Sequence, residues 1–95
     1  MTSRLHADKG KVRNVSDDSA IELGRKVTNA LRMKREELGI SQNELAQRCN
    51  LSRTGLRAIE LGINSPTFVS LCRISNALGV SLGGIVLEIE KTTPC

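Results

Sequence analysis

Apolar residues recur at helical spacing through most of the sequence after residue 16. The first run is bounded by residues typical of helix ends. The segment Ser16–Ser19 offers N-terminal caps and acids, and Gly39 suits a left-handed position after the C-terminus. The pattern therefore predicts a first helix from about Ser16–Ser19 to Gly39. Its apolar positions are Ile21, Leu23, Val27, Leu31 and Leu38.

Two short helices are predicted next, joined by a tight turn. Ser41 and Glu44 form a capping box that opens the first of them, and Ser52 caps the second, which Gly62 ends. Asn50, between them, tolerates the left-handed conformation that a tight turn needs. We expect the buried positions to be Leu45, Ala46, Cys49, Leu56 and Ile59. The opposite face of the second short helix carries Arg53, Thr54, Arg57, Ala58 and Leu61.

The last third of the sequence predicts two more elements. Ser65 and Pro66 are expected to be the N-cap and first turn of a fourth helix, which Gly79 closes. Its buried stripe is predicted to be Phe68, Leu71, Ile74, Ala77 and Leu78. Ser81 caps a fifth segment, residues 81–91, in which two glycines weaken a helix and IVLEIE could alternate as an edge strand. The flanking caps favour a helix, so we predict an all-α, compact five-helix domain.

Composition supports this fold class and narrows the function. Aromatic residues make up 1% of the 95 residues, with Phe68 the only ring. Strands of a sandwich or barrel usually carry more rings, and an RNA-binding sheet or single-strand platform depends on them for stacking. The net charge of +4 is compatible with a polyanionic partner.

Metal, redox and catalytic chemistry find little support in the sequence. The three cysteines, Cys49, Cys72 and Cys95, form no C-x-x-C pair, and His6 is the only histidine. No paired carboxylates or activated nucleophile are apparent. We therefore expect no metal, no cofactor and no enzymatic activity. An odd cysteine count, no membrane-spanning run and no signal peptide predict a cytoplasmic protein without a membrane partner.

Charge and periodicity divide the chain into three parts. Residues 1–17 are expected to be a flexible basic arm, because few large apolar groups accompany its arginines and lysines. Such an arm can enter a minor groove or be a tail without function. Residues 18–91 are predicted to be the folded domain, and residues 92–95 a C-terminal tail.

Residues 41–66 carry the functional signal. Two short capped helices, a tight turn between them, and a second helix with one apolar and one polar face are typical of a helix-turn-helix. Ala46 is small enough to let the two helices approach closely. The polar face of the second helix is then free to lie in a major groove of duplex DNA.

These residues resemble the Cro and phage-repressor type (XRE-type) of helix-turn-helix transcriptional regulators. The resemblance covers about residues 23–88, and the matched positions occur in the family's order. It implies a lambda-repressor-like fold and a sequence-specific regulator of transcription. The residues that carry it are Gly39-Ile40-Ser41-Gln42, Glu44-Leu45-Ala46, Leu51-Ser52, Glu60-x-Gly62, Asn64-x-Pro66, and Ala77-Leu78-Gly79-Val80-Ser81-Leu82.

The resemblance also implies roles for individual residues. Gln42 matches a position that contacts phosphate and braces the recognition helix, and Ser52 matches a second phosphate-facing cap. Arg35 and Glu60 match a pair that forms an internal ion pair. Arg53 and Arg57 lie on the face that reads bases, although both could be ordinary solvated charges. The expected DNA-binding residues are Gln42, Asn43, Ser52, Arg53, Thr54, Arg57, Ala58 and Asn64.

A single short recognition helix reads too few base pairs to select one site in a genome. We therefore expect a homodimer on a palindromic operator, with Ile85, Val86 and Ile89 of the largely apolar C-terminal segment at the dimer interface. The alternative is an antitoxin that binds its own operator and also holds a toxin as its protein partner. A non-specific DNA-binding protein is a further alternative, distinguished by steep salt dependence without sequence preference.

Overall fold

The computed structural model of this chain describes residues 17–92, and they fold into five helices with no strand among them. The helices are α2 (Asp17–Glu37), α3 (Gln42–Cys49), α4 (Arg53–Glu60), α5 (Phe68–Leu78) and α6 (Leu82–Thr92). The predicted all-α class is confirmed, and the ambiguous segment near the C-terminus is a helix. The expected arm and tail, with His6 and Cys95, lie outside the described residues, except that Asp17 and Thr92 belong to helices.

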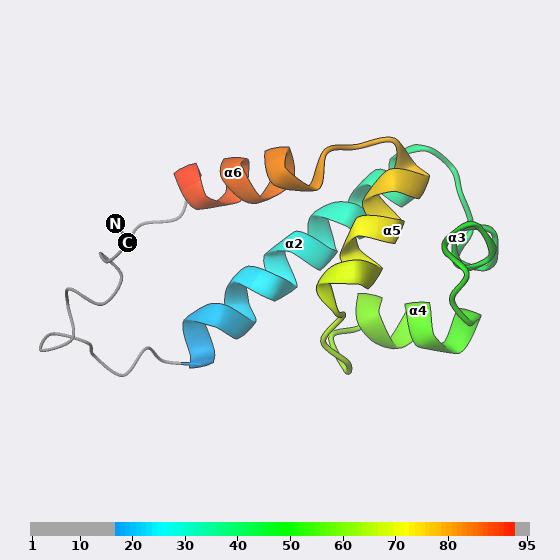
Figure 1. Cartoon of the computed structure of the whole chain (residues 1–95), viewed down its shortest axis with the longest axis horizontal. Coiled ribbons are helices and arrows are strands. Elements are labelled where there is room, and N and C mark those ends of the chain that lie inside the picture. The colour runs from blue at the N-terminus through cyan, green and yellow to red at the C-terminus, as the bar shows by residue number, and fades with distance from the viewer. Residues whose placement is uncertain (1–16, 93–95) are drawn as a thin grey trace, which may run out of the picture.

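The long helix α2 organises the domain (Figure 1). It contacts α4, α5 and α6, while α3 packs against α4 and α5. The short helices α3 and α4 therefore lie at one end of the molecule, and α6 lies along α2 away from them (Figure 1). The buried core consists of Val27, Leu31, Leu45, Ala46, Cys49, Leu56, Ile74 and Leu78.

Local signals in the sequence set most helix ends. Ser41 Oγ accepts a hydrogen bond from the backbone N–H of Glu44 (3.0 Å), and Ser52 Oγ accepts one from Gly55 (2.9 Å). Asn50 adopts the predicted left-handed conformation, with φ 59°. Ser81 Oγ accepts from the N–H of Gly84 (3.0 Å). The glycines of α6 thus lie in its capped first turn, where they weaken a helix least.

Some predicted positions are wrong. The N-cap of α5 is Thr67, whose Oγ1 accepts from the N–H of Ser70 (3.0 Å), so Ser65 and Pro66 precede the helix. Phe68, predicted to be buried, is 71% exposed, because α5 begins there and its buried residues start only at Ile74. Two apolar positions predicted for the first helix, Ile21 in α2 and Leu38 directly after it, are also exposed.

Within residues 17–92, no single helix has the length and apolar character needed to cross a membrane. Helices α5 and α6 meet that test of length and composition only as a pair, and the pair is bent by 104°.

The thiol of Cys49 is expected to be almost unreactive in the folded protein. Cys49 is 2% exposed, and burial raises the pKa of its thiol, an effect that the positive charge of Arg73 partly offsets. Since the thiolate is the nucleophile, iodoacetamide at pH 8 should label the half-buried Cys72 well before Cys49. Mass spectrometry of the labelled peptides measures this order, and urea should abolish it. Equal native labelling of the two residues would contradict a packed core around Cys49.

Candidate nucleic-acid interface

Helix α4 has one face in the core and one in solvent. Leu56 and Ile59 are buried against the other helices. Arg53, Thr54 and Arg57 are exposed, and Ala58 is half-buried at the edge of the same outer face. Successive helical residues are 100° apart, so positions 53, 54, 57 and 58 share one side of α4. The predicted polar face is therefore present and open to a partner.

A buried ion pair fixes the end of α4. Arg35 of α2 donates from Nε to Glu60 Oε2 (2.8 Å) and from Nη2 to Glu60 Oε1 (3.0 Å). The two side chains are only 10% and 6% exposed. Arg35 Nη1 also donates to the carbonyl oxygen of Ile40 (2.8 Å), in the connection between α2 and α3. The internal ion pair that the family resemblance implied is confirmed.

Gln42 joins this network from the first residue of α3. Its Nε2 donates to Glu60 Oε1 (2.8 Å). Because Glu60 thereby binds side chains of both α2 and α3, its carboxylate holds the end of α4 at a fixed position relative to α3. Gln42 thus braces α4, as the resemblance implied, while its contact with phosphate stays a prediction.

The predicted polar residues border the outer face of α4. Gln42 and Asn43 occupy the N-terminal turn of α3, and Ser52 caps α4. Helix N-termini present backbone N–H groups and positive dipole ends, which favour phosphate oxygens. Asn64 lies after α4, where its backbone N–H donates to the carbonyl oxygen of Ala58 (3.2 Å). The fold therefore gathers all eight predicted residues around α4 and the start of α3.

Two exposed apolar side chains in the same region were not assigned a function from the sequence. Leu61 is 59% exposed and Ile63 is 72% exposed. The sequence places Leu61 on the outer face of the second short helix but indicates no role for it. Ile63 lies in a polar loop, where no helical or strand periodicity indicates whether its side chain is buried. Only the structure reveals that both side chains are in solvent beside the DNA-binding candidates.

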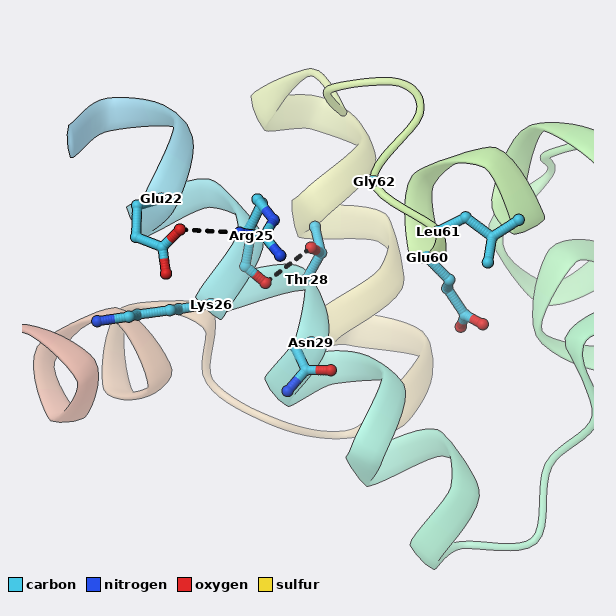
Figure 2. Close-up of a pocket in the computed structure, with 8 residues that line it drawn as sticks. All are labelled: Glu22, Arg25, Lys26, Thr28, Asn29, Glu60, Leu61 and Gly62. Atoms are coloured by element: carbon cyan, nitrogen blue, oxygen red, sulfur yellow. Dashed lines mark hydrogen bonds and ion pairs between the residues drawn. The ribbon is translucent and has the colours of Figure 1, made fainter. Parts of the chain in front are cut away.

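A pocket lies between part of α2 and the end of α4 (Figure 2). On its α2 side, Arg25 Nη1 donates to Glu22 Oε1 (2.9 Å), and Leu61 lines the other side. Arg25 is therefore already paired with a carboxylate of its own helix. No group of three or more His, Cys, Asp or Glu side chains in the described part of the chain is placed to hold a metal ion.

Comparison with known proteins identifies the family. The helix-turn-helix family model matches residues 31–85, which include α3, α4 and α5. A control protein, C.MunI of a Mycoplasma species, is 32% identical over 75 residues, which are 79% of this chain and 97% of that protein. An uncharacterized HTH-type transcriptional regulator of Sinorhizobium fredii is 34% identical over 65 residues, 68% and 83% of the two chains. An uncharacterized HTH-type transcriptional regulator of Methanothermobacter thermautotrophicus is 43% identical over 49 residues, which are 52% of this chain and 71% of that protein.

The fold and the outer face of α4 are those of a DNA-binding helix-turn-helix protein. More particularly, the chain belongs to the XRE-type family of helix-turn-helix transcriptional regulators.

Proposed function

We propose that this protein is a homodimeric regulator that binds a palindromic operator in duplex DNA, as a repressor or controller of transcription. The observation that carries the proposal is the outer face of α4. Arg53, Thr54 and Arg57 are exposed there, while the opposite face is buried and the C-terminal end is held by Arg35 and Glu60. Such a rigid, half-polar helix of eight residues suits the width of a major groove.

The state of the arginines supports this assignment. Arg25, Arg32, Arg35 and Arg48 each have a glutamate partner within 4.0 Å. Arg53 and Arg57, like the exposed Arg73 of α5, form no ion pair with any residue between 18 and 92. Their guanidinium groups are therefore available to bind guanine O6 and N7 bidentately. Thr54, between them, can bond a base or place its methyl group against thymine.

Phosphate contacts would set the orientation of α4. Gln42 and Asn43 at the start of α3, Ser52 at the start of α4 and Asn64 after it are the proposed contacts. Contacts of this kind position the protein on the duplex and carry no sequence information of their own.

Helix α6 is the proposed dimer interface. Leu87 is 57% exposed, whereas Ile85, Val86 and Ile89 are half-buried against the protomer's own core. Leu87 forms a ridge between two mainly apolar hollows, into which a symmetry-related Leu87 can pack in an isologous contact. One hollow includes Ala30, Val80, Ile85 and Ile89, and the other includes Phe68, Cys72, Leu82 and Val86.

In vitro selection from a random duplex library at near-physiological salt tests the proposal. The wild-type protein should recover a symmetric site whose half-site centres are about 34 Å apart. A protein with Arg53→Ala and Arg57→Ala should bind that site at least about a hundredfold more weakly, because each lost bidentate contact costs about 1–3 kcal/mol.

Arg48→Ala is the matched control. It removes an exposed arginine from α3 that already pairs with Glu44 (2.6 Å), so operator binding should change by less than about threefold. Recovery of no common sequence by the wild type would contradict the proposal. That result would favour a non-specific DNA-binding protein, or an antitoxin that requires its partner.

A further inference from the structure

The segment that follows α4 combines two exposed apolar side chains with an absence of charge. Leu61 and Ile63 flank Gly62, and both are more than half exposed. Residues 61–66, between Glu60 and Thr67, contain no charged side chain. This segment therefore offers no cation to the phosphate backbone, although it adjoins the face that carries Arg53 and Arg57.

Leu61 continues the outer face of α4. It lies seven residues after Thr54 and four after Arg57, which places the three side chains on one side of the helix. Its own backbone is still right-handed helical, with φ −83°. From Thr54 to Leu61 the helix axis rises about 10 Å. Leu61 therefore lies about two helical turns beyond Thr54, on the side of α4 that bears Arg53 and Arg57.

The turn after α4 holds Ile63 beside this face. Gly62 has φ 79°, a left-handed conformation that glycine adopts without strain. Its N–H donates to the carbonyl oxygen of Ile59 (3.1 Å), and the N–H of Ile63 donates to that of Ala58 (2.9 Å). These two bonds form a Schellman motif, in which the residue after the glycine folds back over the last helical turn. Ile63 is therefore fixed next to Ala58 while its side chain stays in solvent.

We propose that Ala58, Leu61 and Ile63 form an apolar strip that contacts the C5-methyl groups of thymines in the operator. The proposal rests on the DNA-binding function proposed above and assigns it a specific chemical target. The thymine methyl is the apolar group that a base pair presents in the major groove. A strip of apolar side chains that continues a face bearing unpaired arginines matches that groove, because guanine acceptors and thymine methyls occur there side by side. The half-site therefore contains thymines next to the guanines read by Arg53 and Arg57.

Deoxyuridine substitution tests this inference, since it removes the thymine methyl and keeps every hydrogen-bonding group. Each thymine of the selected half-site is replaced in turn, and binding is measured by fluorescence anisotropy. At one or two positions, wild-type affinity should fall about three- to fivefold, the effect of losing one buried methyl group. In Leu61→Ala or Ile63→Ala the same substitution should have no further effect, as a double-mutant cycle requires for groups in contact.

Met33→Ala is the matched control, because Met33 is an apolar residue of α2 that is 56% exposed. It should retain the full deoxyuridine effect. An operator that binds equally well with deoxyuridine at every thymine would overturn the inference, as would variants of Leu61 and Ile63 that keep the full effect. If the proposed operator binding itself were wrong, the selection experiment would recover no operator. That result would come before any deoxyuridine substitution and is therefore distinguishable from failure of this inference.

Discussion

Replacing Glu60 with alanine is expected to lower the free energy of unfolding by about 3–5 kcal/mol. The substitution leaves the guanidinium of Arg35 buried without its carboxylate, and Gln42 Nε2 loses its acceptor. A buried charge without a partner costs far more than the intact pair contributes. Since 1 kcal/mol shifts Tm by about 4–8 °C in a domain of this size, circular dichroism should record a fall of at least about 12 °C.

An exposed ion pair provides the comparison. Arg48 Nη2 lies 2.6 Å from Glu44 Oε2, and each of the two side chains is 47% exposed. Glu44→Ala should therefore cost less than about 1 kcal/mol. The double variant with Arg35→Met and Glu60→Met should be more stable than Glu60→Ala, because neither charge is left alone in the interior. If Glu60→Ala were no more harmful than Glu44→Ala, the network around Glu60 would not be what holds α4 in place.

The sequence predicted the helices well because their ends depend on local interactions. The caps Ser41 and Ser52 and the left-handed residues Asn50 and Gly62 act within three to five residues of their partners, so their types alone indicate the turns. The start of α5 was misplaced because Thr67 is a second cap candidate only two residues after Ser65. The backbone N–H of Asn64 still donates to the carbonyl oxygen of Ala58, so the chain lies against the end of α4 up to residue 64. Residues 65–67 then connect this turn to the start of α5.

The site was less accessible to local reasoning. Arg35 and Glu60 are 25 residues apart, and nothing near either one indicates the other. The family resemblance supplied that pair, and the structure added Gln42 as a donor to the same carboxylate. Exposure of Leu61 and Ile63 depends on where α2 and α5 leave the end of α4 uncovered, which no spacing along the chain encodes. The structure gives the positions of the predicted DNA-binding residues, and their contacts with DNA stay predictions.

Leu87→Asp is expected to convert the protein to a monomer and to weaken binding to the full operator about a thousandfold. Leu87 is 57% exposed on α6, so its replacement removes a large apolar side chain from the proposed interface with little effect on the protomer's core. In a two-fold dimer the two aspartates would face each other in an interface from which water is excluded, and burying two like charges there disfavours the dimer. With all base contacts present, the affinity for a specific site exceeds the affinity for non-specific DNA by about 10³–10⁷. A monomer keeps only half of these contacts, so it loses a large part of that difference in affinity.

Light scattering and operator titration measure the two effects together. Met33→Asp is the control, since it adds the same charge at a similarly exposed apolar position of α2, outside both hollows beside Leu87. It should leave the dimer and the operator affinity unchanged. Binding to an isolated half-site should be equal in Leu87→Asp and wild type, because α4 is untouched. A Leu87→Asp protein that stays dimeric would place the interface elsewhere, whereas a monomer with full operator affinity would show that one copy of α4 reads the whole site.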